Sequence, residues 1–248
     1  MPSDVPTAGL LNRERIEWVV FDAVGTLLFP DPPVARAYWE SGRMHGSALD
    51  ETEVGRRFRQ ACFNFDRDEL DAADPDSATH LQTSETHEQR RWRSVVRGVF
   101  DDLPDIDACF RDLHEHFARP SAWSAFGDVE PTLRALRLAG LRLGIASNFD
   151  GRLHGVLDGD RCFAALELRA ISSEVGYRKP SRRFFHAVAE MAGCPAERIL
   201  FVGDDPANDV DGARAAGMPA LQIDRNSSES AADVVADLTD LLDVLACR

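Results

Sequence analysis

The chain has 248 residues, of which 44% are hydrophobic and 28% are charged. This composition is typical of folded globular proteins and excludes a largely disordered chain. Acidic residues outnumber basic ones, and the formal net charge is −14. We therefore expect no nucleic-acid partner, because phosphate backbones are bound by clustered lysine and arginine. The length permits one large α/β domain, or a core that carries a smaller inserted domain.

The sequence also predicts no membrane partner. It contains no run of about 18 apolar residues, the length that a spanning helix needs. The N-terminal residues lack the basic segment and apolar stretch of a secretory signal. The five cysteines are scattered without a CxxC pair, which favours reduced thiols in a cytoplasmic protein and disfavours a zinc site. Nothing in the sequence indicates an oligomeric state. The cysteines are Cys62, Cys109, Cys162, Cys194 and Cys247.

Four short apolar runs, each followed by polar residues, predict buried β-strands. Near-continuous apolar runs of four to six residues are typical of parallel strands that are covered on both faces. Because sequential parallel strands need long crossovers, the segments between them are expected to be helical. The four runs are Trp18–Phe21, Leu141–Ala146, Ile199–Val202 and Pro219–Ile223.

Helical segments alternate with these runs. One begins near Pro131 and ends around Gly140, and a second covers 182–191, with Ser181 as its N-cap. Residues 209–216 predict a third helix, and the apolar positions of 234–245 predict a closing one. Alternating strands and helices predict an α/β fold with a Rossmann-like, doubly wound parallel sheet.

Residues 30–119 differ from the rest of the chain, since they carry few strand signals and several helical ones. Apolar residues from Trp92 to Phe100 recur on one helical face, and 53–65 and 106–117 predict further amphipathic helices. Residues 71–77 predict a surface loop. We therefore expect a helical cap at 30–119, inserted into a core formed by 1–29 and 120–248.

Polar residues gather where the predicted strands end. Asp22 follows the first strand, Ser147 and Asn148 follow the second, and Asp204 and Asp205 follow the third. In open parallel sheets, ligands bind beyond the carboxyl ends of the strands. Carboxylates that crowd one edge repel one another and raise each other's pKa. A divalent cation and a nearby lysine would relieve that repulsion.

Lys179 is the only lysine in the chain, and the other 27 basic residues are arginines. It precedes the helix capped by Ser181. An ammonium is a compact point charge, whereas a guanidinium is broad and planar. The retention of one lysine where every other basic residue is arginine indicates a site that needs the compact charge, beside a phosphate and a carboxylate.

Four segments in this order resemble the motifs of the haloacid dehalogenase (HAD) superfamily. The resemblance extends from about Trp18 to Ile223 and points to the subgroup with a helical cap after the first motif, subfamily IA with its REG-2-like members. One aspartate motif alone would be weak, but four in order at strand ends are specific. The segments are Phe21–Leu27, Ile145–Asn148, Gly176–Pro180 and Val202–Asp209.

The resemblance implies a catalytic role for three residues. Asp22 is expected to be the nucleophile that attacks phosphorus and forms an aspartyl-phosphate. Lys179 and Ser147 are expected to assist it. Thr26, Ser147, Asn148 and Lys179 are expected to bind the phosphoryl group of a small phosphorylated substrate.

The resemblance also implies Mg²⁺, a hard cation that prefers oxygen ligands together with a substrate phosphate. Asp22 and Asp204 are expected to contact the metal through their carboxylates, and Val24 through its backbone carbonyl. Asp209 is expected to hold the metal through water or to orient Lys179. Asp205 is expected to join this cluster.

One position departs from the family pattern. HAD phosphatases usually carry a second aspartate two residues after the nucleophile, as general acid and base, and Val24 occupies that position here. General acid–base catalysis typically contributes about 10²- to 10⁴-fold. We therefore expect a phosphatase that is weak, above all on alkyl phosphates, or one whose acid comes from a cap histidine. The cap histidines are His45, His80, His87, His114 and His116.

Two alternatives stay open at this point. A 2-haloacid dehalogenase also has an apolar or aromatic residue two positions after the nucleophile, but it lacks the acidic cluster, and extra negative charge disfavours a carboxylate substrate. A regulatory protein that binds a phosphoryl ligand and turns it over poorly is the second alternative. The phosphonate-cleaving branch uses a cap lysine and is excluded, since 30–119 contains none.

Overall fold

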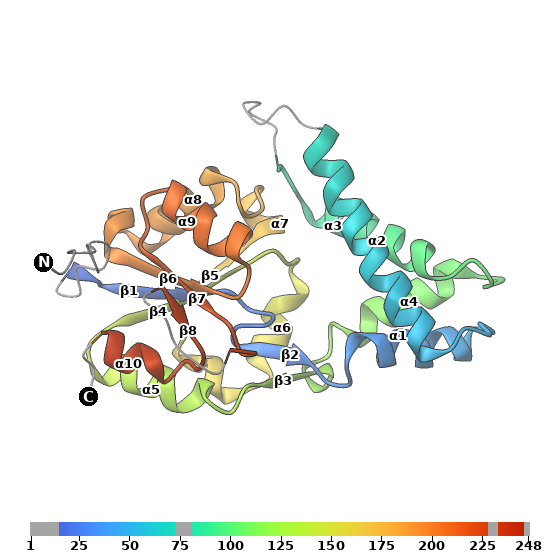
Figure 1. Ribbon diagram of the computed structural model, residues 1–248, viewed down its shortest axis with the longest axis horizontal. Coiled ribbons are helices and arrows are strands. Elements are labelled where there is room, and N and C mark those ends of the chain that lie inside the picture. The colour runs from blue at the N-terminus through green and yellow to red at the C-terminus, as the bar shows by residue number, and fades with distance from the viewer. Residues whose placement is uncertain (1–14, 73–80, 228–232, 246–248) are drawn as a thin grey trace, which may run out of the picture.

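The computed structural model describes residues 15–72, 81–227 and 233–245. At its centre lies a six-stranded sheet in the order β5-β4-β1-β6-β7-β8 (Figure 1), and all of its neighbouring strands pair in parallel. The chain first builds the sheet outward on one side of β1 and then on the other. The strands are β1 (Trp18–Phe21), β4 (Arg142–Ser147), β5 (Leu168–Ile171), β6 (Ile199–Gly203), β7 (Ala220–Ile223) and β8 (Val234–Val235).

Helices cover both faces of this sheet, which explains why β1 is apolar throughout. Val19 and Phe21 pack into the core on one face, and Trp18 and Val20 pack into the core on the other. The predicted doubly wound α/β fold is therefore confirmed. On the first face lie α5 (Val129–Leu138), α6 (Arg152–Asp158) and α10 (Asp240–Val244), and on the second lie α8 (Arg182–Ala192) and α9 (Gly212–Ala215).

Short helical turns complete the core around the sheet. Helix α7 (Ser172–Val175) precedes the loop that carries Lys179, and a π-helical segment, Pro206–Asp211, follows β6. Three 3₁₀ turns lie at Pro120–Ala122, Arg161–Ala165 and Ala196–Arg198.

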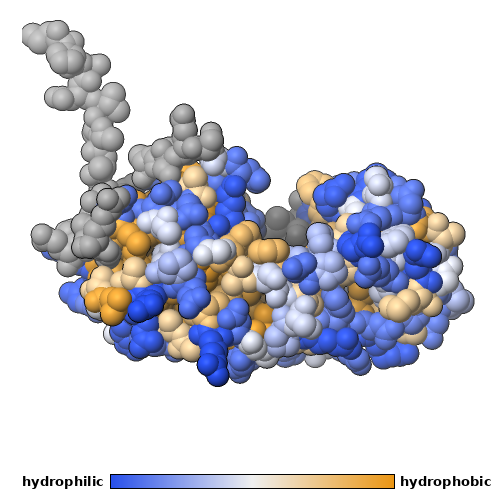
Figure 2. All heavy atoms as spheres, turned by 90° about the horizontal axis from the view of Figure 1, so that it is seen from below, coloured by the Kyte–Doolittle hydropathy of each residue, from blue (hydrophilic) through white to orange (hydrophobic). Residues whose placement is uncertain are grey.

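Four helices form a second body with a small apolar core of its own. This body, the cap, is carried by β2 (Leu28–Pro30) and β3 (Trp123–Ala125), which pair antiparallel. Core and cap form the two lobes of Figure 2, whose visible face is largely polar. The bounds 30–119 stay a prediction, but the two strands bracket the same helices: α1 (Val34–Met44), α2 (Glu51–Ala72), α3 (Glu85–Val99) and α4 (Ile106–His116).

The structure corrects the expectation for the C-terminal segment. Val234 and Val235 do not begin a helix but form β8, paired with Gln222 and Ile223 of β7. Both valines are β-branched, and the free edge of β7 offers them a ladder to join. Only Asp240–Val244 is helical.

Three other expectations differ in detail. The expected helix at 209–216 begins earlier, with the wide turns of Pro206–Asp211. Helix α2 runs through Ala72, so the expected loop at 71–77 starts later, and 73–77 lie outside the described residues. The edge strand β5 was not predicted, because Arg169 interrupts its apolar run.

The described cysteines are all free thiols, and Cys247 lies outside the described residues. None of the helices in the described part of the chain combines the length and apolar character that crossing a bilayer requires.

Candidate active site

Three carboxylates meet at the carboxyl end of the central strands. Asp22 follows β1, Asp204 follows β6, and Asp209 lies on the π-helical segment that comes next. One oxygen atom of each lies within 4.8 Å of the others. The sheet order places β1 beside β6, so Asp22 and Asp204, 182 positions apart in sequence, become neighbours. The structure thus brings together three of the expected metal ligands.

Lys179 enters this cluster from the loop between α7 and α8. Its Nζ donates to Oδ1 of Asp22 at 2.6 Å and to Oδ1 of Asp209 at 2.5 Å. The lysine side chain lies against the ring of Phe201, with Nζ 5.4 Å from the ring centroid. Lys179 is 3% exposed and Asp209 1%. A buried ammonium of this kind is stable only when it is paired and hydrogen-bonded.

Asn148 holds the backbone of Lys179 in place. Its Oδ1 accepts from the Lys179 backbone N–H at 2.7 Å, and its Nδ2 donates to the Lys179 carbonyl at 3.1 Å. These two bonds tie the end of β4 to the lysine loop. The expected substrate contact of Asn148 stays a prediction, while its side-chain oxygen and nitrogen position the lysine.

The cluster holds more negative than positive charge, and its pKa values reflect this. Partial burial and the charges of Asp22 and Asp209 raise the pKa of Asp204 to about 7. Burial raises the pKa of Asp209 to about 6, because Lys179 offsets only part of the desolvation cost. Burial alone would lower the pKa of Lys179, but the attraction of Asp209 and Asp22 outweighs it and raises that pKa. The site therefore has room for additional positive charge.

Two glycines allow the carboxylates to approach the backbone. Gly25 has a φ of 90°, in the left-handed region that favours glycine, and a Cβ there would overlap the Asp204 carboxylate. A Cβ on Gly203 would overlap the carboxylate of Asp209 in the same way. Both positions must stay without a side chain for the acidic cluster to form.

Two expected site residues have other partners in the structure. Asp205 caps the π-helical segment: its Oδ1 accepts from the N–H groups of Ala207 and Asn208, and its Oδ2 accepts from the Asn208 side chain. These bonds hold the Asp205 carboxylate on the turn that it caps, and its expected place among the metal ligands stays a prediction. Asp22, Asp204 and Asp209 form the cluster without it.

Thr26 also contacts the acidic cluster. It is fully buried, and its hydroxyl donates to Asp204 at 3.4 Å. Thr26 thus contacts Asp204 in this structure, and its expected contact with the phosphoryl group stays a prediction. Ser147 ends β4 at the same sheet edge, 3% exposed.

Sequence reasoning missed Arg225, which braces the loop after Asp22. Its guanidinium donates to the carbonyls of Gly25 and Thr26, at 3.2 and 2.6 Å, and to both carboxylate oxygens of Asp128. The guanidinium also stacks on Phe126, 3.6 Å from the ring centroid. Arg225 follows β7 at the same sheet edge, and that position was the signal available in the sequence.

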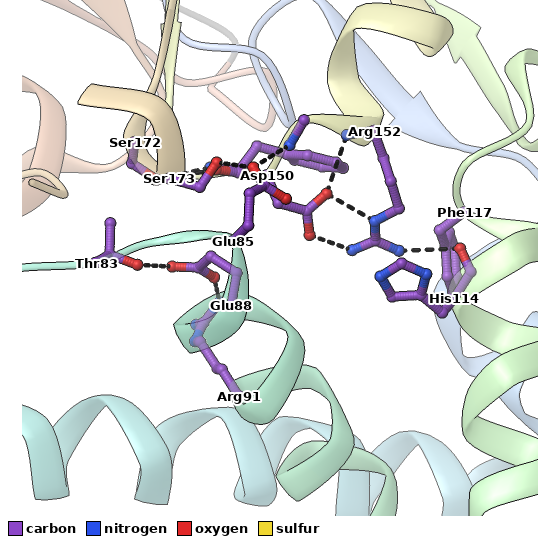
Figure 3. A network of polar contacts seen from close by, with 12 residues as sticks. Thr83, Glu85, Glu88, Arg91, His114, Phe117, Asp150, Arg152, Ser172 and Ser173 are labelled. Atoms are coloured by element: carbon purple, nitrogen blue, oxygen red, sulfur yellow. Dashed lines mark hydrogen bonds and ion pairs between the residues drawn. The ribbon is translucent and has the colours of Figure 1, made fainter. Parts of the chain in front are cut away.

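Polar contacts join the cap to the core beside the site (Figure 3). The carboxylate of Glu85, in the first turn of α3, accepts from the Gly151 N–H at 2.8 Å and from the Ser173 hydroxyl. A second contact joins α6 to α4, where Arg152 donates to the His114 carbonyl at 3.1 Å. These bonds fix the cap over the carboxyl ends of β4 and β5.

The cap also pairs with the backbone of the lysine loop. Thr83 donates its N–H to the Gly176 carbonyl at 3.0 Å, and Arg178 donates its N–H to the Leu81 carbonyl at 2.9 Å. The residue that precedes Lys179 is thus held by the cap, and Lys179 itself by Asn148 of the core.

A cavity of about 370 Å³ lies between cap and core. Its core wall includes Val24, Arg178 and Asn208, which lie within two positions of a cluster residue in sequence, and Asn148, which bonds to the Lys179 backbone. Such a volume falls within the range of small-molecule sites, about 300–1,000 Å³. Among the expected cap histidines, His114 lines this cavity, and His80 lies outside the described residues.

Comparison with known proteins assigns the family. A family model of haloacid dehalogenase-like hydrolases matches residues 16–217, most of the chain. This chain belongs to the haloacid dehalogenase-like hydrolases. As expected of that family, it has a Rossmann-like core and carries its motif residues at one edge of the sheet.

Three curated relatives of this hydrolase illustrate the match. The human haloacid dehalogenase-like hydrolase domain-containing protein 3 is 29% identical over 219 residues, which cover 86% of this chain and 84% of the relative. The Drosophila rhythmically expressed gene 2 protein is 24% identical over 229 residues, covering 87% and 86%. Phosphatase MT3486 of Mycobacterium tuberculosis is 35% identical over 119 residues, covering 47% and 54%.

Solved structures that share this fold include one named as a HAD-hydrolase and one named as a dehalogenase. The putative HAD-hydrolase YfnB of Bacillus subtilis, bound to magnesium, superposes with a TM-score of 0.73 at 15% identity, covering 94% of this chain and 99% of its own. The L-2-haloacid dehalogenase RSc1362 gives a TM-score of 0.69 at 23% identity, covering 93% and 99%. At these identities the likeness concerns the fold alone.

The donor set of this HAD-like hydrolase fits a hard divalent cation. Three carboxylates converge with an excess of negative charge, and burial and mutual repulsion raise the pKa of Asp204 and Asp209. Carboxylate oxygens are the protein ligands that Mg²⁺ prefers. Asp22, Asp204 and Asp209 are therefore the residues that would hold the ion.

Replacing Lys179 with methionine tests the charge balance of the cluster. Without added divalent cation, we expect Lys179→Met to lower the free energy of unfolding by about 3–5 kcal/mol, because Asp22 and Asp209 lose their buried counter-charge. The loss should shrink near pH 5, where the raised pKa values of Asp204 and Asp209 let both carboxylates bind protons. Urea unfolding at pH 5 and pH 8 measures both effects.

The matched control is Arg182→Met, which removes one positive charge from an exposed position three residues away. It should change stability by no more than about 0.5 kcal/mol. Equal losses in the two variants would show that net charge, and not the buried ion pair, sets the effect.

Proposed function

We propose that this protein is a Mg²⁺-dependent phosphatase that hydrolyses a small phosphorylated substrate through an aspartyl-phosphate on Asp22. The observation that carries the proposal is the buried ammonium of Lys179 between Asp22 and Asp209, with Asp204 beside them. The phosphatase name of the mycobacterial relative agrees with it.

In this proposal Lys179 leaves one oxygen of the nucleophile available. Its Nζ binds Oδ1 of Asp22, so Oδ2 attacks phosphorus. The new bond joins Oδ2 to phosphorus, the bond from phosphorus to the ester oxygen breaks, and that oxygen keeps the electron pair. Water then attacks the phosphorus of the aspartyl-phosphate, which restores the Asp22 carboxylate and releases inorganic phosphate.

The remaining residues place and neutralise the phosphoryl group. Lys179 offsets the negative charge of the nucleophile and of the incoming phosphate. We assign Ser147 to the phosphoryl oxygens, because it ends β4 at the same edge. Mg²⁺, held by Asp22, Asp204, Asp209 and the Val24 carbonyl, would supply positive charge against those oxygens.

Val24 leaves the departing oxygen without an acid from the usual position. Val24 lines the cavity between cap and core, where the leaving group would lie in this proposal. A poor leaving group such as an alkoxide then departs without a proton. The proposed activity is accordingly weak on alkyl phosphates.

Neither alternative accounts for the cluster as well. A 2-haloacid substrate would bring a carboxylate beside Asp204 and Asp209, whose charges repel it. A regulatory protein that only binds a phosphoryl ligand has no need for a free oxygen on Asp22. We therefore retain both alternatives as outcomes of the assay.

Asp22→Asn tests the nucleophile. Assayed with acyl, aryl and alkyl phosphates in the presence and absence of Mg²⁺, the wild type should hydrolyse at least one class in a metal-dependent manner. Asp22→Asn should lose at least about 10³-fold in kcat, since an amide cannot form the intermediate. Full activity in this variant contradicts the mechanism. Halide release from a 2-haloacid without metal supports the dehalogenase, and binding of phosphate esters without turnover supports the regulatory protein.

Asp204→Asn and Asp205→Asn form a matched pair of neighbouring substitutions that tests the metal. Asp204→Asn should raise the Mg²⁺ concentration for half-maximal activity at least about tenfold, and it should remove the Mg²⁺-induced rise in Tm. Asp205→Asn should leave both unchanged, because asparagine caps a helix as well as aspartate does. Equal effects of the two variants would contradict the assignment of Asp204 as a ligand.

Val24→Asp tests whether the missing acid limits the rate. It should raise kcat on an alkyl phosphate by about 10²-fold. The gain on an acyl phosphate should be far smaller, because its leaving group needs no proton. Val24→Asn, similar in size but without an acid, should give no gain. Equal rates of wild type and Val24→Asp on the alkyl phosphate would mean that the acid comes from elsewhere.

A further inference from the structure

The cavity between cap and core is built for an apolar group. Its wall carries seven aromatic side chains, which come from the cap helices α1, α2, α3 and α4, the β3 strand, the segment that follows α4 and the loop after β4. Aliphatic side chains fill the space between them. The aromatic residues are Tyr38, Phe58, Trp92, Phe110, Phe117, Trp123 and Phe149.

Three polar side chains of this wall, Arg152, Asn148 and Asn208, form hydrogen bonds to protein partners. Arg152 forms two hydrogen bonds of 2.7 Å to Asp150 and a third to the His114 carbonyl (Figure 3). The side-chain oxygen and nitrogen of Asn148 both form hydrogen bonds to the Lys179 backbone. The Asn208 side chain donates to Asp205. These bonds reduce the capacity of the wall to hold a ligand with several hydroxyl groups.

Three arginines line the wall, of which Arg152 pairs with Asp150 and Arg91 lies 3.8 Å from Glu88; the third is Arg178. No aspartate or glutamate lines the cavity in the part of the chain that the structure describes. Burial, and then the charge of Arg152, lower the pKa of His114, so its ring is neutral near pH 7. That ring lies 5.5 Å from Phe110 and adds another flat face to the wall. Sugars and other polyols are usually held by carboxylate acceptors, and this wall offers none.

We propose that the substrate is a phosphate monoester of an aromatic alcohol, with a body of one or two rings that lies in this cavity. The proposal rests on the proposed phosphatase function and names its substrate class. Val24, Arg178 and Asn208 line the cavity and lie within two positions of a cluster residue in sequence, so a phosphate at the acidic cluster has its ester group in the cavity. Aromatic rings pack well against the edges and faces of other rings.

The position of Val24 agrees with this substrate class. When Oδ2 of Asp22 attacks phosphorus, the ester bond breaks and its electron pair stays on the departing oxygen. A phenolate spreads that charge into its ring and takes its proton from water afterwards. An aryl ester therefore needs no acid at Val24, and an apolar residue there packs against the ring.

The test compares ligands of equal charge that differ only in the organic group. Phenylphosphonate and ethylphosphonate carry no ester bond and are not hydrolysed, so calorimetry on the Mg²⁺-loaded full chain measures binding alone. We expect phenylphosphonate to bind at least about tenfold more tightly. Equal affinities overturn the proposal.

A pair of tryptophan variants locates the effect. Trp92→Ala, in the cavity wall, should reduce the phenyl preference to about threefold or less. Trp39→Ala should leave it unchanged, because Trp39 lies on α1 of the same cap, between Arg36 and Arg43, and outside the cavity. A preference that survives in Trp92→Ala overturns the cavity as its source.

A second variant, which fills the cavity, tests the proposal even if Trp92→Ala fails to fold. Val34 is partly exposed in the cavity wall, so Val34→Phe should be tolerated and should weaken phenylphosphonate binding at least about fivefold by occupying the space of its ring. Ethylphosphonate binding should stay within about twofold. Equal weakening of both ligands contradicts the proposal.

Hydrolysis of phenyl phosphate and ethyl phosphate by the same preparations separates the two proposals. Turnover of both esters with no phenyl preference in binding refutes the aromatic substrate and leaves the phosphatase intact. A phenyl preference in binding with no turnover of either ester refutes the phosphatase, while the selectivity of the cavity stands.

Discussion

The buried ion pairs of Lys179 are the constraint on which the rest of this site depends. One ammonium, almost without contact to solvent, bonds to carboxylates that follow two neighbouring strands. Burying it is costly, and the cost is met only because both partners lie within 2.6 Å and Phe201 covers the side chain. β1, β6 and the lysine loop must therefore meet in one arrangement. Gly25 and Gly203 make that arrangement possible by keeping their side of the cluster clear.

The loop that carries Lys179 is held from two directions. Asn148 binds the lysine backbone from the core, while Leu81 of the cap binds the residue before it. The position of the cap and that of the ammonium are thus linked through two consecutive residues, Arg178 and Lys179. A substrate that seats the cap over its cavity would at the same time fix the charge beside the nucleophile, so that binding in the apolar wall and positioning of the reactive groups support each other.

The sequence predicted the chemistry of the site better than its surroundings. Asp22, Asp204, Asp209 and Lys179 were identifiable because buried parallel strands are easily recognised and their carboxyl ends share one edge. The sequence could not show that Asp205 caps the segment after β6, because that role depends on local hydrogen bonds. The strand β5 and the brace by Arg225 depend on tertiary pairing. The contact of Glu85 with Gly151 and Ser173 joins segments far apart in sequence, without a local pattern to mark it.

The antiparallel pair of β2 and β3 has a consequence for how the chain folds. β1 pairs with β4 across more than a hundred intervening residues, a separation that makes strand pairing slow. Most of those residues belong to the cap, which has its own apolar core. Because its two ends meet at β2 and β3, a cap that collapses early brings β1 and β4 close together. The effective loop between β1 and β4 is then short, and the entropy cost of bringing the two strands together is smaller.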